Sequence, residues 1–174
     1  AYSCPGGLSF VSSALFKLCP TEGHLANILA HEVAHVGHKH ALQIVRRAKL
    51  FQGLGNISAA ALNKEDSGKL NKILNTMENT LFDKGLDKNM EFEADLSAME
   101  TAYRTGYSPA GMIEVLEMLK DLEGNETKKS SWYGTHPPLD QRIARCKKAL
   151  AKYPDGNDLR LFTGRIKWYQ GRIS

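Results

Sequence analysis

The sequence predicts a mainly helical (α+β) domain with one small β-sheet near its N-terminus. Apolar residues recur at helical spacing in several segments. Turn glycines precede a short run of β-favouring residues at 7–12. A chain of 174 residues that is 42% hydrophobic is long enough to bury one core. We therefore expect a single domain over residues 1–174, with a C-terminal extension at 149–174 that its weak pattern assigns to no regular structure.

Turn residues separate the expected elements along the chain. Glycine, proline and serine residues flank most of the segments with apolar residues at helical spacing. They predict where these segments begin and end, to within a few residues. The expected elements are a strand at 7–12, a turn or brief helix at 13–18, helices at 24–44, 69–82, 87–103, from 108 onward and at 139–152, a helical excursion broken by turns at 46–68, and a polar loop at 124–134.

Composition narrows the classes of partner. The net charge is +4, from 23 basic and 19 acidic residues, and the basic residues are scattered rather than gathered into a stripe. We therefore expect no nucleic-acid partner. No apolar run reaches the 18 residues of a membrane span. The abrupt start at Ala1 is typical of a trimmed or processed chain, so a membrane anchor or targeting segment would lie outside this sequence.

Cysteine usage leaves the redox compartment open. There are three cysteines, Cys4, Cys19 and Cys146, and none of them forms a CxxC pair. Because the number is odd, at least one thiol stays free or pairs between chains. A bridge between Cys4 and Cys19 remains an open alternative.

The most informative stretch is the HExxH motif His31-Glu32-Val33-Ala34-His35, in a run of apolar residues at helical spacing. Residues four apart lie on the same face of a helix, so both imidazoles can point at one zinc ion. Glu32, next to the first ligand, suits a base beside the metal. The alternative is two core histidines and an ion-paired glutamate, but a buried apolar helix has little reason to carry three such groups.

A catalytic zinc site needs a third protein ligand, and three candidates compete for this place. The longer metzincin spacing fails, because it requires Gly at position 38 and His at position 41, where this chain has His38 and Ala41. On an unbroken helix, His38 lies two turns beyond His31 and cannot reach the same ion. We expect His38 and His40 to be groups at the surface or at a helix end.

The favoured third ligand is Glu91, in Glu91-Phe92-Glu93-Ala94-Asp95. Glu91 and Asp95 are four apart and share a helix face, so Glu91 can bind the metal while Asp95 orients a ligating histidine from its far nitrogen. Glu93 points elsewhere and is expected to be solvated or ion-paired. The alternative for Glu91 and Asp95 is an ordinary charged helix face.

With these motifs the chain resembles the zinc metallopeptidases of the HtpX and CAAX prenyl protease type, a gluzincin family. The resemblance spans about residues 1–149 and rests on four motifs in this order: Pro5-Gly6-Gly7, His31–His35, Glu91–Asp95 and Thr135-His136-Pro137-Pro138. It implies a zincin-like metallopeptidase fold whose active-site helix carries HExxH. Membrane helices of the integral-membrane members are absent, so the chain is similar to the compact, soluble branch.

The resemblance also implies a role for each matching residue. One zinc ion per chain would be held by His31, His35 and Glu91, with Glu32 as the general base. His136 would stabilise the oxyanion or gate the metal, and Arg142 would lie close to the centre. Lys88 departs from the family pattern, which commonly has an arginine at this position. The strand residues that would pair with an extended substrate are Gly7, Leu8, Ser9 and Phe10.

These roles define the expected function. We expect a zinc-dependent endopeptidase with polypeptide substrates, such as unfolded or misassembled proteins of the bacterial cell envelope. The resemblance implies a periplasmic or envelope-associated location. One alternative is a chaperone or assembly factor that binds unfolded clients in the same groove. A zinc site with a purely structural role would close all four metal positions and would not need Glu32.

Overall fold

The computed structural model describes residues 1–51, 88–125, 138–156, 159 and 162–173. The helix expected at 69–82, the segment 52–68, most of the polar loop at 124–134 and His136 lie outside the described residues.

The chain begins with a β-hairpin. Strand β1 (Tyr2–Ser3) pairs antiparallel with β2 (Ser9–Phe10), with Tyr2 opposite Phe10 and Ser3 opposite Ser9. The turn between them needs glycine, because Gly6 and Gly7 have φ values of 104° and 95°. The expected strand at 7–12 is therefore too long: Gly7 lies in the turn, Leu8 just precedes β2, and Ser12 caps the next helix.

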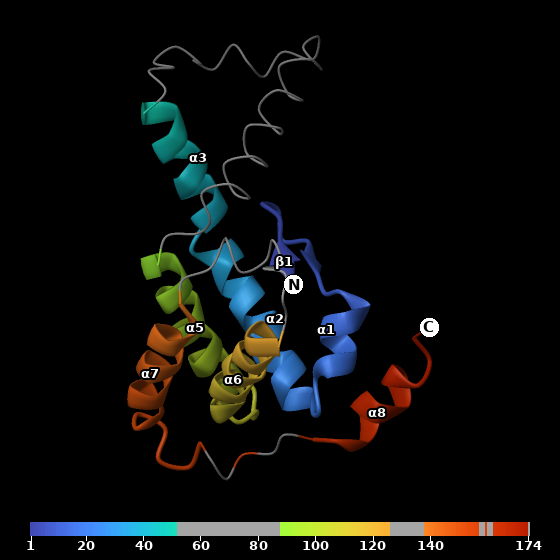
Figure 1. The fold of residues 1–174 in the computed structure, drawn as a ribbon. Coiled ribbons are helices and arrows are strands. Elements are labelled where there is room, and N and C mark those ends of the chain that lie inside the picture. Colours follow the sequence, from blue (N-terminus) through green and yellow to red (C-terminus); the bar gives the residue numbers. More distant parts are fainter. Residues whose placement is uncertain (52–87, 126–137, 157–158, 160–161, 174) are drawn as a thin grey trace.

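Helix α2 (Glu22–Gly37) is the central helix of the described part of the chain (Figure 1). The short helix α1 (Ser13–Leu18), which confirms the turn or brief helix expected there, precedes it. Thr21 caps α2, because its side chain accepts a hydrogen bond from the backbone N–H of His24. Helices α5, α6 and α7 lie on one side of α2, and α1 and α8 on the other.

The expectation of a single helix at 24–44 is wrong, because α2 ends at Gly37 and a second helix begins at His40. Lys39 has φ of 57°, the left-handed conformation that ends a helix, and its N–H donates to the carbonyl of Val36 over 3.0 Å. A new helix, α3 (His40–Phe51), then begins and continues upward from the end of α2 in Figure 1. After this break the His40 ring contacts His35 of α2, which matters for the site described below.

Three further helices build the main core against α2. They are α5 (Lys88–Arg104), α6 (Ala110–Asn125) and α7 (Leu139–Leu150), close to the bounds expected from sequence. Small residues permit close packing: a Cβ on Gly111 of α6 would lie 2.7 Å from the side-chain nitrogen of Asn27 on α2. The buried core residues of this cluster are Ala30, Ala98, Met99, Met112, Ile113, Leu116, Leu139, Ile143, Cys146 and Ala149.

The C-terminal extension is part of the fold, although its sequence pattern predicted no structure. Helix α8 (Gly164–Gln170) buries Ile166 to 2% exposure in a second cluster with Cys19, Ile28 and Val115. The Gln170 amide donates to the carbonyls of Phe16 and Cys19, over 2.9 and 2.7 Å. The extension thus packs against the start of the chain.

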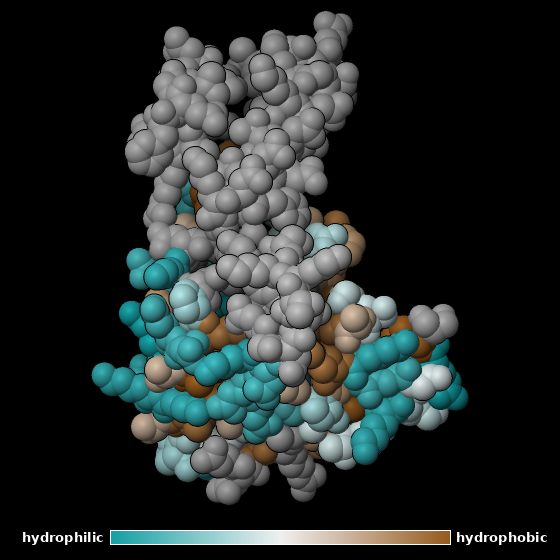
Figure 2. Space-filling view, viewed as in Figure 1, coloured by the Kyte–Doolittle hydropathy of each residue, from teal (hydrophilic) through white to brown (hydrophobic). Residues whose placement is uncertain are grey.

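The described part confirms the expectation of a mainly helical protein with one small sheet near the N-terminus. On the face shown in Figure 2, hydrophilic residues cover much of the described part, and hydrophobic ones form smaller patches between them. None of the described helices combines the length and the apolar character needed to cross a membrane. All three cysteines are free thiols, which removes the Cys4–Cys19 bridge as an alternative.

Candidate metal centre

Three side chains that could hold a metal ion converge between α2 and α5. His31 and His35 lie one turn apart on the buried face of α2, and Glu91 lies in the first turn of α5. Glu91 is 0% exposed. Among the described residues, these three form the group whose candidate ligand atoms all lie within 4.8 Å of one another.

The separations of these atoms fit a small ion. Nε2 of His31 lies 2.9 Å from Nε2 of His35. The Glu91 oxygens lie 3.6 Å from Nε2 of His31 and 3.4 Å from Nε2 of His35. Ligand arms of about 2.0–2.1 Å in a tetrahedron would place neighbouring donors about 3.3–3.4 Å apart. Two imidazoles and a carboxylate are also a donor set that zinc accepts, so the residues fit the metal.

The carboxylates on α5 are anchored from α7. Asp95, 1% exposed, lies 3.0 Å from Nδ1 of His31, on the ring side away from Glu91. Arg142 donates through Nε and Nη2 to the two oxygens of Asp95, over 2.8 and 2.6 Å. Nη1 of Arg142 lies 2.9 Å from Glu91. One buried guanidinium therefore orients both carboxylates, and the two-pronged contact explains why arginine suits this position.

Charge shapes the protonation of this cluster in the metal-free protein. Burial lowers the pKa of His31, but hydrogen bonds and charges from Asp95 and Glu91 outweigh burial and raise this pKa to about 9. For Asp95, burial raises the pKa, and the hydrogen bonds from Arg142 and His31 reverse this effect, so that its pKa lies below the ordinary value. The two carboxylates thus create a negative electrostatic potential at His31, which favours a cation there.

Glu32 lies beside the cluster on α2 and is buried. Its carboxylate accepts a hydrogen bond from the Ser3 hydroxyl on β1, over 2.7 Å. Ser3 also lies 3.1 Å from the Glu32 carbonyl and 3.0 Å from the Ser9 hydroxyl of β2. The hairpin is thus tied to Glu32 by a side chain that sequence reasoning missed, because a single serine 29 residues before Glu32 carries no recognisable signal.

His40 occupies a position that the sequence did not predict. We expected a surface or helix-end group, and His40 does begin α3, but it is 0% exposed. Its Nδ1 lies 2.9 Å from Nδ1 of His35, and its Nε2 lies 3.1 Å from Glu93. The position at a helix end is therefore as expected, whereas the burial was not predicted, because the sequence analysis assumed an unbroken helix. His38 is partly exposed at the end of α2, where it contacts Ser97 and Glu93. Glu93 is exposed, in line with the expectation of a solvated side chain, and it contacts ring nitrogens of both histidines.

The remaining predicted site residues are less centrally placed. The segment Gly7–Phe10 is exposed, and Ser9 of its strand β2 is linked to Glu32 through Ser3. Lys88 is exposed at the first residue of α5. His136 is not among the described residues. Its proposed position near the metal stays a prediction.

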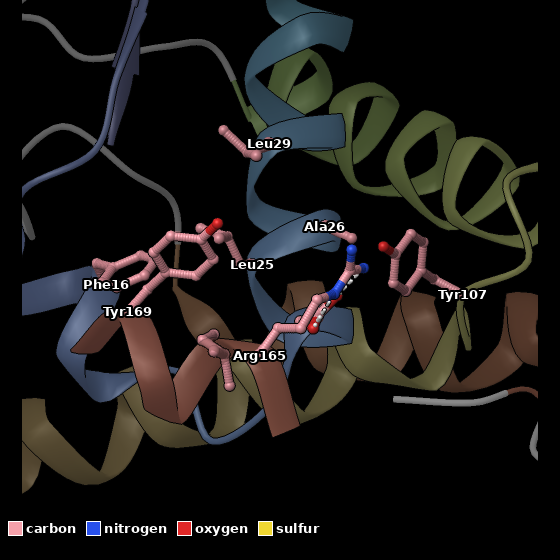
Figure 3. Close-up of a pocket in the computed structure, with 9 residues that line it drawn as sticks. Phe16, Leu25, Ala26, Leu29, Tyr107, Arg165 and Tyr169 are labelled. Carbon is pink, nitrogen blue, oxygen red and sulfur yellow. Dashed lines mark hydrogen bonds and ion pairs between the residues drawn. The ribbon is translucent and has the colours of Figure 1, made fainter. Parts of the chain in front are cut away.

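A separate hollow of about 220 Å³ lies between α1, α2 and α8 (Figure 3). Phe16, Leu25, Leu29 and Tyr169 line it, and the ion pair between Arg165 and Glu22 crosses one end. Leu29 and His31 are two residues apart, so at about 100° per residue their side chains point to nearly opposite sides of α2. The hollow is therefore distinct from the metal-ligand cluster.

Fold and site together define a mainly helical protein with a buried candidate metal centre of two histidines and a glutamate, and with a further glutamate beside it. The family model for peptidase family M48 matches residues 1–150, and the chain belongs to this family. Its members are metal-dependent peptidases, which agrees with the donor set of the cluster.

Individual relatives show the same class of protein. The chain is 27% identical over 150 residues to the mitochondrial metalloendopeptidase OMA1 of Schizosaccharomyces pombe, covering 86% of this chain and 43% of that protein. It is 27% identical over 149 residues to the β-barrel assembly-enhancing protease of Escherichia coli K12, covering 83% of this chain and 31% of that protein. The chain thus spans less than half the length of the curated relatives it matches.

Proposed function

We propose that the protein is a zinc-dependent metallopeptidase that hydrolyses internal peptide bonds of polypeptides. The observation that carries this proposal is the convergence of His31, His35 and Glu91 beside a buried Glu32. Membership of a peptidase family supports the reaction class. In this proposal His31, His35 and Glu91 hold one zinc ion per chain, and the active-site helix α2 belongs to a zincin-like fold.

Each side chain of the cluster has a distinct task in the reaction. When bound, zinc would polarise the scissile carbonyl and lower the pKa of a water molecule. Glu32 accepts the proton of the attacking water and returns it to the leaving amine. Asp95 fixes the ring of His31 from its far nitrogen, and Arg142 holds Glu91 and Asp95 in place. His136 would stabilise the oxyanion or gate the metal.

We propose that an extended substrate pairs with the hairpin along Gly7, Leu8, Ser9 and Phe10, by β-augmentation. The exposure of β2 supports this proposal. The bond from Ser3 to Glu32 also supports it, because Ser3 lies opposite Ser9 in the hairpin and so links the edge to the proposed base. Such backbone pairing suits cleavage within a chain and tolerates varied side chains.

For the biological role we propose protein quality control in a bacterial cell envelope, with unfolded or misassembled envelope proteins as substrates and a periplasmic or envelope-associated location. The β-barrel assembly-enhancing proteases among the relatives support this role. Membrane association would reside in segments outside this sequence. Within family M48, we propose the compact branch of the HtpX and CAAX prenyl protease type, which the Glu91-x-x-x-Asp95 spacing supports.

The test compares Glu32→Gln with the wild type. We expect the variant to bind one zinc ion per chain and to lose cleavage of casein and of an unfolded outer-membrane protein, because an amide cannot accept the water's proton. Glu117→Gln, a change at an exposed ion pair with Lys147, is the matched control and should stay active. Cleavage by Glu32→Gln at the wild-type rate would refute the role of Glu32.

Metal analysis tests the ligand set independently of catalysis. Wild type should contain one zinc ion, and Glu91→Ala should lose it or bind it much more weakly. A chelator should abolish activity, and added zinc should restore it. The alternative of a chaperone or assembly factor would be favoured by two results together. The wild-type protein would bind an unfolded client equally well with and without zinc, and it would not cleave that client.

A further inference from the structure

We propose that His40 is a positioning residue that holds the ring of His35 from its far nitrogen, with Glu93 holding His40 in turn. This inference rests on the proposed function, because it assigns His35 Nε2 to the metal. The three side chains come from three helices, α2, α3 and α5, and form a chain that ends at the protein surface.

The geometry singles out one contact. Nδ1 of His40 lies 2.9 Å from Nδ1 of His35, and the two rings meet edge to face at 74° with their centroids 5.0 Å apart. Nε2 of His35 points the other way, toward Nε2 of His31 and Glu91. His40 is 0% exposed, so its ring is held by the surrounding protein beside Nδ1 of His35.

The positions of the protons follow from the metal ligand. If Nε2 of His35 binds zinc through its lone pair, Nδ1 must carry the hydrogen and donate it. Nδ1 of His40 must then accept, and this leaves the hydrogen of neutral His40 on Nε2. That nitrogen lies 3.1 Å from a Glu93 oxygen, which can only accept when ionised. The carboxylate of Glu93 therefore selects the tautomer of His40 that orients His35.

Both metal histidines would then be held in the same manner by different partners. Asp95 on α5 contacts Nδ1 of His31 over 3.0 Å, and His40 on α3 contacts Nδ1 of His35 over 2.9 Å. Such outer partners fix the tautomer and orientation of a ligand, and their removal weakens metal binding by roughly 10–100-fold. The left-handed conformation of Lys39 makes this contact possible, because on an unbroken helix two residues five apart would point about 140° away from each other.

The experiment measures zinc affinity by chelator competition in three variants. His40→Leu keeps an apolar side chain in the buried space and removes the acceptor, so we expect roughly 10–100-fold weaker binding. His40→Asn places its side-chain oxygen near the position of Nδ1 and should restore most of the affinity. His24→Leu is the matched control, because His24 is also a buried histidine but its ring nitrogens contact Thr21 and Glu114, and this variant should bind zinc as wild type does.

A second variant, Glu93→Ala, tests the other end of the chain of contacts. Because the Glu93 side chain is exposed, this variant is expected to fold normally. It removes the partner of His40 Nε2 and should weaken zinc binding by a few-fold, less than His40→Leu. Thermal unfolding of the metal-free variants separates affinity from folding. The inference is overturned if His40→Leu binds zinc as wild type does, or if His40→Asn binds as weakly as His40→Leu. Wild type that binds no zinc would refute the proposed function instead.

Discussion

Replacing Arg142 with methionine tests how the buried charges of the site are balanced. The guanidinium is 2% exposed and reaches both oxygens of Asp95, over 2.8 and 2.6 Å, and one oxygen of Glu91 over 2.9 Å. Methionine occupies similar space but offers no hydrogen-bond donor. Two fully buried carboxylates would then face each other without their shared cation.

The expected loss is large. Removing one partner of a buried ion pair typically costs about 3–5 kcal/mol of unfolding free energy. For a chain of this length, each kcal/mol lowers the unfolding temperature by about 2–4 °C. We therefore expect the metal-free Arg142→Met protein to unfold roughly 6–20 °C below wild type. Arg145→Met, one turn on in α7, is the matched control. Its guanidinium lies exposed over the Phe92 ring, a contact worth about 0.5–1 kcal/mol.

The assay is thermal and urea unfolding of both variants in chelator, with Asp95→Asn and the double variant completing a thermodynamic cycle. Asp95→Asn should offset part of the loss in Arg142→Met, because it removes one of the two buried negative charges. Equal unfolding temperatures for Arg142→Met and Arg145→Met would refute this account of the buried cluster.

Three further predictions concern the hairpin, the C-terminal helix and the helix break. Ser3→Ala should lower the rate of peptide hydrolysis roughly 10-fold with zinc content unchanged, because Glu32 loses a charge-assisted hydrogen bond; an unchanged rate would contradict this. Ile166→Ala should lower the unfolding free energy by about 2–5 kcal/mol, whereas Ile173→Ala, at an exposed position, should change it by less than about 0.5. Lys39→Val should have an unfolding free energy about 1–2 kcal/mol lower than that of Lys39→Gly, since a valine backbone disfavours positive φ. Denaturant titration measures both variants, and equal stability would contradict this prediction.

Helical periodicity was sufficient to predict the elements that carry the candidate ligands. The apolar spacing around His31 and His35 places both on one buried face, and the i, i+4 relation of Glu91 and Asp95 does the same on α5. These relations depend only on local geometry, which a sequence pattern expresses directly. The distance between the two helices depends on the core between them. For that reason the pairing of Asp95 with His31, and not with His35, had to come from the structure.

The features that were missed depend on contacts between distant residues. Lys39 takes a left-handed conformation without being a glycine, so no residue type marks the end of α2 there. The burial of His40 follows from that break. Helix α8 is short and weakly patterned, and its stability comes from Ile166 inserting beside Cys19 and from hydrogen bonds of Gln170 to carbonyls at the end of α1. Such an element becomes recognisable only when its tertiary partner is known.

The burial of the α5 carboxylates disagrees with the interpretation of that helix as an ordinary charged face. An ordinary charged face would leave Glu91 and Asp95 in water, yet they are 0% and 1% exposed. Arg142 neutralises one of the two buried negative charges, and in the metal-free protein the proton of His31, whose pKa is raised to about 9, neutralises the other. The Glu91 oxygens lie within 3.6 Å of the facing imidazole nitrogens, where a metal cation would offset the same charge in place of that proton. Charge balance thus supports a cation site at the point where the donor atoms converge.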